Sequence, residues 1–147
     1  MYTNILIAID ASDLAARGLD HGLQLAKAIG AKVVVLTVTE HWLPAIDQFG
    51  IPVGYDEFPQ YDEKMTEFAK TVLDKARVAA TAAGVEAEFV HQPNSHPSDG
   101  ILDVAKARHS DLIVMASHGH HGIRRVLLGS QASEVLAHSE VPVLVVK

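Results

Sequence analysis

The sequence predicts an α/β protein built on one open, parallel, five-stranded sheet with helices on both faces, a Rossmann-like arrangement. Two observations predict this fold class. Short apolar runs alternate with helical patterns four times along the chain, and a fifth apolar run closes it. The length of 147 residues fits a single domain, expected over residues 1–147, that buries a core without disulfides, since the chain has no cysteine.

Each expected strand is a short apolar run bounded by polar residues, a pattern typical of strands that are buried on both faces of a sheet. The third run is less apolar than the others, whereas the last is apolar on both faces. The runs are residues 4–10, 32–38, 86–92, 111–117 and 141–147.

Between these runs, apolar residues recur every three or four positions, as they do on one face of a helix. The first pattern begins at Leu14 and ends before Gly30, and the second runs from Met65 to Gly84. Glycine is a common residue at the end of a helix, so both stops are well marked. Two shorter patterns follow: Ile101, Leu102 and Ala105, then Ala132, Val135 and Leu136.

Segment 41–63 follows neither pattern and carries three prolines and two glycines. Residues 40–63 hold six acidic side chains and no Lys or Arg, whereas the rest of the chain carries 12 acids and 12 basic residues. We expect an irregular acidic loop or lid after the second strand, because long loops in compact domains are often functional. The alternative is a variable surface insertion.

Charge and composition argue against several classes of protein. The net charge is −6 and there is no basic stripe, so DNA and RNA are poor partners. The first apolar run has five residues, ends at Asp10 and follows no basic region, unlike a signal peptide. No run approaches the roughly 18 apolar residues of a membrane span. We therefore expect a cytoplasmic protein with no membrane partner.

The segment ASHGHHGIRRVLLGSQAS, residues 116–133, joins the fourth expected strand to the last helix. His118, His120 and His121 offer imidazoles to zinc, nickel or copper, although the glycines leave them without a fixed geometry. The same glycines let a backbone approach a phosphate, and the helix that follows attracts anions at its start, where Ser130 can cap it. A plain polar connection is the third interpretation.

Ligands of an open parallel sheet bind beyond the carboxyl ends of the strands, where the strand order reverses. If the first and fourth strands are the central pair, the site lies between residues 10–12, segment 116–133 and the chain after Val38. Other nucleotide motifs are absent, since neither G-x-G-x-x-G nor G-x4-G-K-[ST] is present, and a G-x-S-x-G elbow is missing too.

The whole chain resembles the universal stress protein family. The resemblance covers ILIAIDASDLAARGLDHGLQLAKAIGAKVVVLTV, HPSDGILDVAKARHSDLIVMASHG and RRVLLGSQASEVLAHSEVPVLVVK, and only segment 41–63 lacks family character. The ATP-binding branch of that family carries G-x2-G-x9-G-[ST]. Here the frame is Ala116-x2-Gly119-x9-Gly129-Ser130, so the spacing is kept and the first glycine is an alanine. A methyl group is a small obstruction there, unless the position requires a positive φ.

The resemblance implies the strand order 3-2-1-4-5 of adenine nucleotide alpha hydrolase-like folds, with a nucleotide at the carboxyl ends of strands 1 and 4. It implies that Asp10 lies near the ribose and adenine, and that backbone groups of Val38 read the adenine edge. Without the resemblance, Asp10 reads as a helix-capping turn residue and Val38 as a strand end. The other residues that it assigns to the nucleotide are Ala8, Ile9, Met115, Ala116, Gly119, Gly129, Ser130, Gln131 and Ala132.

The resemblance implies a stress-response sensor or regulator that binds ATP, ADP or AMP, with Mg²⁺ as an optional companion of ATP. Catalysis beyond slow ATP hydrolysis is not expected, because the cradle has no lysine and its acid, Asp10, belongs to the nucleoside end. Arg124 and Arg125 could reach a phosphate but are expected to face solvent.

The last expected strand, residues 141–147, is the sheet edge in the implied order. An exposed apolar edge invites a second copy of the chain, and the resemblance also implies a homodimer. Two other functions remain open. One is a nucleotide-free dimeric module that binds client proteins, and the other is a metal-dependent hydrolase that uses the histidines.

Overall fold

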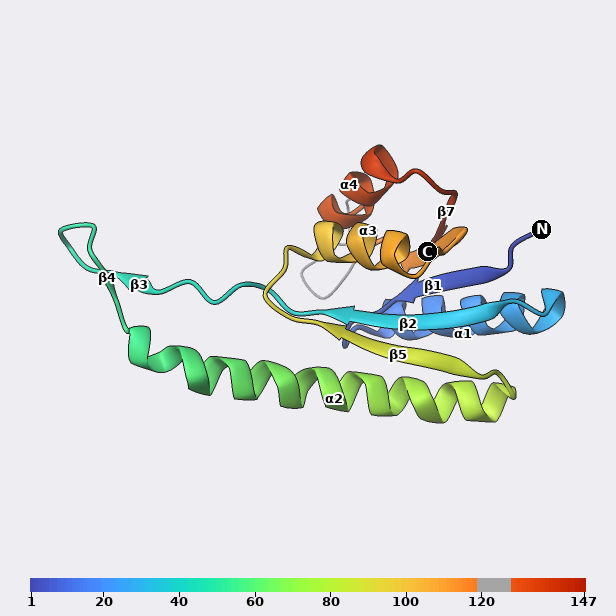
Figure 1. Cartoon of the computed structure of the whole chain (residues 1–147), viewed down its shortest axis with the longest axis horizontal. Helices are drawn as coiled ribbons and strands as arrows, with labels where there is room; N and C mark the ends of the chain where they lie inside the picture. The colour runs from blue at the N-terminus through green and yellow to red at the C-terminus, as the bar shows by residue number, and fades with distance from the viewer. Residues whose placement is uncertain (119–127) are drawn as a thin grey trace.

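Five parallel strands form the centre of the protein, in the order β5-β2-β1-β6-β7 (Figure 1). Counted along the chain, this is the predicted order 3-2-1-4-5. The computed structural model describes residues 1–118 and 128–147. The strands are β1 (Asn4–Ala8), β2 (Lys32–Val38), β5 (Ala87–Gln92), β6 (Leu112–Ala116) and β7 (Val143–Val146).

The expected bounds are confirmed for β2, whereas β1 ends two residues before the predicted Asp10. The Ile9 amide still donates to the Leu36 carbonyl over 2.8 Å. The Asp10 carboxylate, however, accepts a hydrogen bond from the Ser12 amide at 2.8 Å and so turns the chain toward the first helix. A short polar side chain that bonds to the backbone two residues on is typical of such turns.

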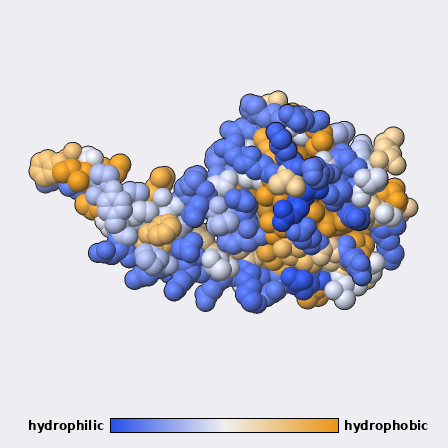
Figure 2. Space-filling view, viewed as in Figure 1, coloured by the Kyte–Doolittle hydropathy of each residue, from blue (hydrophilic) through white to orange (hydrophobic). Residues whose placement is uncertain are grey.

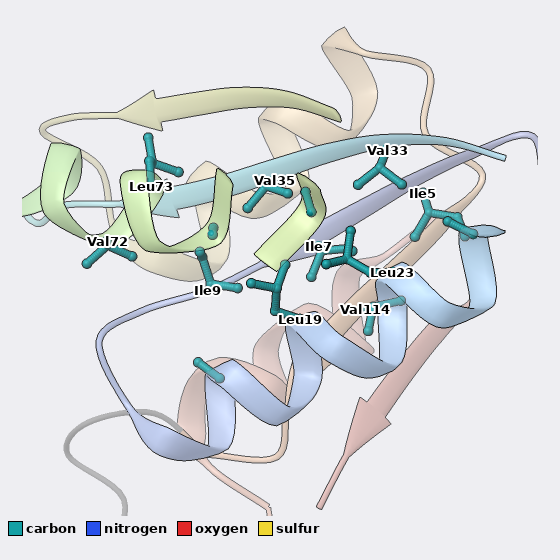
Figure 3. Close-up of a cluster of buried hydrophobic side chains, with 14 of the residues drawn as sticks. Ile5, Ile7, Ile9, Leu19, Leu23, Val33, Val35, Val72, Leu73 and Val114 are labelled. Atoms are coloured by element: carbon teal, nitrogen blue, oxygen red, sulfur yellow. The ribbon is translucent and has the colours of Figure 1, made fainter. Parts of the chain in front are cut away.

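Helices cover both faces of the sheet, as predicted. Two of them, α1 (Asp13–Ile29) and α2 (Phe58–Ala83), pack on one face, and α3 (Pro97–Ala107) and α4 (Ser130–His138) pack on the other. Alternate residues of the strands therefore enter two separate cores. Figure 3 shows the first core, in which Ile7 of β1 lies among Leu19 and Leu23 of α1 and Val35 of β2.

Helix α1 lies unusually close to the sheet at Gly22. A Cβ atom at this position would lie 2.6 Å from the Ile7 Cδ1 atom, so any larger residue forces the helix or Ile7 to move. The two glycines expected to end α1 and α2 are confirmed: Gly30 and Gly84 have φ values of 71° and 70°, in the left-handed region.

The prediction of an irregular segment over residues 41–63 is wrong from residue 45 onward, where the chain contains regular elements. Residues 45–46 (β3) and 52–53 (β4) form a short antiparallel hairpin, and residues 55–57 form a 3₁₀ turn, η1. Helix α2 then begins at Phe58, earlier than its apolar pattern indicated. The first buried residue of α2 is Ala69, so its first turns overhang the sheet and carry no buried face to produce a pattern. The hairpin projects away from the sheet (Figure 1).

Two further findings concern the helices. In α4, Ala132 and Val135 are buried as predicted, whereas Leu136 is 43% exposed, because only one side of this helix meets the sheet. No helix of the described residues is both long enough and apolar enough to cross a membrane.

Candidate functional site

The strand order reverses between β1 and β6, and the chain leaves these two strands toward opposite faces of the sheet. After β1 it enters α1 on one face, and the helix that follows β6 is α4, on the other. Ala8 pairs with Met115 of β6 and with Leu36 of β2, so the last residues of three strands meet at one edge. Ligands of open parallel sheets bind at the carboxyl edge beside such a reversal, and the place where a ligand would lie at this edge is called the crevice below. The structure therefore brings Ala8, Ile9, Asp10, Met115 and Ala116 together there.

Val38 presents its backbone toward this crevice. The Leu36 carbonyl accepts from Ile9 on the β1 side, whereas the Thr39 amide donates to Gln92 on the β5 side. Successive residues of a parallel strand face opposite neighbours, so the N–H and C=O groups of Val38 point to the β1 side. Because β1 has ended at Ala8, these groups face the space beyond that strand. A donor and an acceptor on one backbone segment suit the edge of a nucleobase.

Asp10 holds the turn at the carboxyl end of β1. Its Oδ1 atom accepts from the Ser12 amide, and the Ser12 hydroxyl in turn accepts from the Ala15 amide at 3.1 Å as the N-cap of α1. The turn role that the sequence offered for Asp10 is thus observed. The same hydrogen bond fixes the direction of the carboxylate at the mouth of the crevice.

Ala116 occupies its position without backbone strain. It is the last residue of β6, pairs with Val146 and is 8% exposed. Among the described residues, the non-glycine residues with positive φ are Asn94 and His109, so Ala116 keeps an extended backbone. The alanine in the first motif position therefore costs only the space of one methyl group.

Gly129 brings the start of α4 against the end of β6. Its amide donates to the Ser117 carbonyl over 2.6 Å, and its φ of −68° is accessible to any residue. A Cβ atom there, however, would lie 3.0 Å from the Ser117 oxygen and 3.1 Å from His118. The close approach, and not the backbone conformation, therefore disfavours a side chain here. A Cβ atom at Gly129 fits only if Ser117, His118 or the start of α4 shifts by a few tenths of an ångström.

The expectation that Ser130 caps α4 is wrong. Gly129 is the N-cap, Ser130 is the first helical residue, and within the described chain no side chain caps this end. The reason is the contact between Gly129 and Ser117, which sets the helix start one residue earlier. The Ser133 amide makes the first bond of the helix, to the Gly129 carbonyl at 2.9 Å. The amides of Ser130, Gln131 and Ala132 precede it at the positive end of the helix dipole, where anions bind.

The Gln131 side chain turns toward α3. Its Oε1 atom accepts a hydrogen bond from the Ser98 amide at 2.9 Å. The side chain therefore points to α3, and only the backbone amide of Gln131 remains available at the start of α4. Beside it, the Glu134 carboxylate accepts from the buried Ser98 hydroxyl at 2.5 Å and lies 3.3 Å from the His96 Nε2 atom. We call these four residues the clasp. It fixes the start of α3 to the start of α4. We call the backbone amides of Ser130, Gln131 and Ala132 at this end of α4 the candidate anion seat.

The clasp also sets the ionisation of Glu134. The hydrogen bond from Ser98 lowers the pKa of this carboxyl below its usual range, and His96 and His138 add to the effect. The clasp was not predicted from the sequence, because His96 and Ser98 lie more than 30 positions from Glu134. A serine directly after the Pro97 that opens α3 is the one local signal.

A second histidine, His91, connects the ends of β2 and β5 at the carboxyl edge of the sheet. The His91 Nε2 atom of β5 lies 2.8 Å from the hydroxyl of the buried Thr39, directly after Val38. Burial lowers the pKa of His91, and the nearby Asp62 carboxylate opposes this shift. The pair ties the end of β2 to β5 where the chain leaves the sheet.

The metal and phosphate interpretations of segment 116–133 depend partly on residues outside the described chain. His120 and His121 lie there, as do Gly119, Arg124 and Arg125. Among the described residues, no group of three or more His, Asp or Glu side chains is placed to hold a metal ion.

Comparison with known proteins gives one family over the full length. The sequence model of the Universal stress protein family matches residues 1–147. Universal stress protein YxiE of Bacillus subtilis is 34% identical over 152 aligned residues, covering all of both chains. The solved structure of Methanocaldococcus jannaschii MJ0577 superposes with a TM-score of 0.81 at 30% identity, covering 100% of this chain and 96% of that one.

Two other solved structures of similar fold contain nucleotides. One is the universal stress protein from Archaeoglobus fulgidus in complex with dAMP, with a TM-score of 0.68 and 26% identity over 99% of this chain and 98% of that chain. The other is a universal stress protein in complex with cAMP, with a TM-score of 0.69 and 26% identity over 99% of this chain and 97% of that chain.

Proposed function

Because the chain belongs to the universal stress protein family, we propose that it binds an adenine nucleotide at the carboxyl ends of β1 and β6 and acts as a cytoplasmic stress-response sensor or regulator. The observation that carries this proposal is the seat formed by Gly129. Its close approach to Ser117 places the amide groups at the start of α4 beside the reversal of strand order. The dAMP and cAMP complexes of similar proteins support the choice of ligand.

The nucleotide would lie across the edge, with its base on β2 and its phosphates on α4. The Val38 backbone reads the adenine edge, and Asp10 receives the ribose. The nucleoside is flanked by Ala8, Ile9, Met115 and Ala116. The phosphates take the amides of Ser130, Gln131 and Ala132, which Gly129 holds beside the end of β6 through its own bond to Ser117. Gly119, which the resemblance also assigns to the phosphates, lies outside the described residues.

Binding, and not turnover, is the proposed activity. Phosphoryl transfer needs charge neutralisation beside the γ-phosphate and a positioned water. Asp10 is engaged at the Ser12 turn, and the start of α4 offers backbone amides and no lysine. When ATP is the ligand, Mg²⁺ would accompany its phosphates, and hydrolysis would be slow at most.

The test combines the small molecules released from the protein with ligand-induced stabilisation. Freshly purified protein is denatured, and the released molecules are identified by mass spectrometry. AMP, ADP and ATP are then added back in a thermal-shift measurement, with GTP as the control for base recognition. We expect an adenine nucleotide near one per chain, or a rise in melting temperature with adenine nucleotides only. If no adenine nucleotide is released and no adenine nucleotide raises the melting temperature, a nucleotide-free interaction module remains as the function.

We also propose that two chains pair through β7. The Pro142 and Val146 carbonyls accept hydrogen bonds from β6, so the backbone groups of Val143 and Val145 face outward from this edge. Val145→Pro removes an outward amide without touching the ladder to β6. The substitution is expected to abolish edge pairing in sedimentation velocity, and an unchanged sedimentation coefficient would contradict it.

A further inference from the structure

Residues 40–58, which connect β2 to α2 and include the first residue of α2, form an apolar arm that projects from the body (Figure 1). Trp42 packs against Tyr55 and Phe58 at its base, with ring centres 6.0 and 5.8 Å apart, and the hairpin lies beyond them. Figure 2 shows apolar residues at this projecting end. The large apolar side chains that the arm exposes by 40% or more are Leu43, Ile46, Phe49, Ile51, Val53, Tyr55 and Phe58.

Such an arm is not expected to remain uncovered in water. A hairpin of two-residue strands has too few pairs to be stable alone. An exposed apolar patch of this extent normally marks an interaction surface. Covering these side chains removes on the order of several hundred Å² from water, within reach of the roughly 800 Å² that each partner gives to a standard interface.

The charge of the arm indicates what covers it. Residues 40–58 include four acids and no Lys or Arg, so two arms repel each other. The opposite end of the body, residues 25–32 and 79–86, is net basic and is called the basic end. It carries Lys27 and Lys32 against one acid, the exposed Glu86, and it exposes Ile29 by 43%. The Lys27 ammonium donates to the Ala83 carbonyl, which holds the ends of α1 and α2 together.

The arm cannot reach the basic end of its own chain. Helix α2 separates them, and its 26 residues span about 39 Å. Figure 1 shows the arm and the end of α2 at opposite ends of the molecule. The complementary surfaces therefore meet only between two copies.

Helix α2 carries an exposed stripe that would join two copies in this way. Lys64, Phe68, Thr71, Lys75 and Val78 follow one another at intervals of four and three residues, away from the buried face. In an antiparallel pair centred on position 73, Phe68 of each copy lies opposite Val78 of the other. Thr71 then opposes Lys75, so no two lysines are brought together. This register carries the start of α2 past the end of the partner's α2, to the basic end.

We propose that two copies of this chain pack antiparallel along the exposed stripe of α2 and that each arm lies on the basic end of the other copy. This interface uses neither the nucleotide site nor the β7 edge. With edge pairing also present, the two interfaces together would build assemblies larger than a dimer.

The experiment is a cross-link between two differently tagged chains. The chain has no cysteine, so Phe49→Cys in one chain and Ile29→Cys in the other give a unique thiol pair. A short bis-maleimide is expected to produce a mixed dimer of both tags. The control replaces Ile29→Cys by Leu136→Cys, which lies on α4 and is exposed to the same 43%. Equal yields from the two pairs, or no mixed dimer from the first, would overturn the proposal.

A second measurement does not depend on a cross-linker. Val78→Asp, at an exposed position, is expected to weaken self-association at least tenfold by sedimentation velocity in the Val145→Pro background, while Leu136→Asp leaves it unchanged. If Val145→Pro does not fold, the same pair is compared with β7 intact, where loss of the larger species is expected. Unchanged association of Val78→Asp in the folded protein would contradict the proposed interface.

Discussion

At the end of β2 the chain passes from the carboxyl edge of the sheet into the arm within a few residues. The two regions are nevertheless held in different ways. At the edge, hydrogen bonds and close contacts fix Ile9, Asp10 and Gly129 within the chain itself. The arm has ring contacts at its base and exposes its apolar side chains beyond them. The two proposals account for this difference: a nucleotide would bind at an edge whose described residues are already held in place, whereas a second copy of the chain would cover the arm.

Enlarging Gly129 is expected to have the largest effect on the first region. Gly129→Leu places a side chain within about 3.1 Å of Ser117 and His118, so these residues or the start of α4 must move away. We expect adenine nucleotide affinity to fall at least tenfold, measured by calorimetry. Ser133→Leu, an exposed site one turn along the same helix, is the matched control and should bind normally. Equal affinities of the two variants would show that the seat does not hold phosphate.

The single tryptophan distinguishes a separate arm from a lid. Trp42 is the only tryptophan in the chain and lies at the base of the arm. If the arm serves a second copy, its fluorescence should shift to the red as the protein is diluted and the copies separate. Saturating AMP at constant protein concentration should leave the emission maximum within a few nanometres. A large shift with AMP would instead make the arm a cover for the nucleotide site.

A smaller effect is expected from restoring the first motif glycine. Ala116 is unstrained, so Ala116→Gly should change nucleotide affinity by less than about threefold, since only one methyl group is removed. Stability should fall by about 0.5–1 kcal/mol, because glycine loses more backbone freedom in a strand. Chemical denaturation and calorimetry check the two values. A tenfold gain in affinity would mean that the alanine obstructs the ligand.

The smallest effect concerns the pH dependence of the clasp. The Ser98 hydroxyl lowers the pKa of Glu134 below its ordinary 4.5 in the folded chain. A carboxyl of this kind stabilises the fold above its unfolded pKa, and the contribution is lost as the pH falls through the folded pKa. Glu134→Gln should therefore lose less stability than the wild type between pH 6 and pH 3, measured by urea denaturation. Glu63→Gln, on α2, is the control, and parallel curves for both variants would contradict the assignment.

The features that were predicted from the sequence differ in kind from those that were missed. The strands and the apolar faces of the helices follow from periodicity, because buried faces leave a repeating pattern. The strand order, in contrast, was predicted from the family resemblance. The first turns of α2 leave none, since nothing before Ala69 is buried, so the helix start at Phe58 was missed. The cap of α4 depends on a contact between Gly129 and Ser117, and the clasp joins residues far apart in the chain. Such contacts have no local pattern from which to be predicted.

The central claim is that the carboxyl edge of β1 and β6 binds an adenine nucleotide. Isothermal titration of AMP and ATP into the wild-type protein, freed of any bound nucleotide, tests it most directly. The account predicts saturation near one nucleotide per chain, no binding of GTP, and loss of binding in Gly129→Leu. No saturable heat with any adenine nucleotide, from protein shown to be folded, would contradict it.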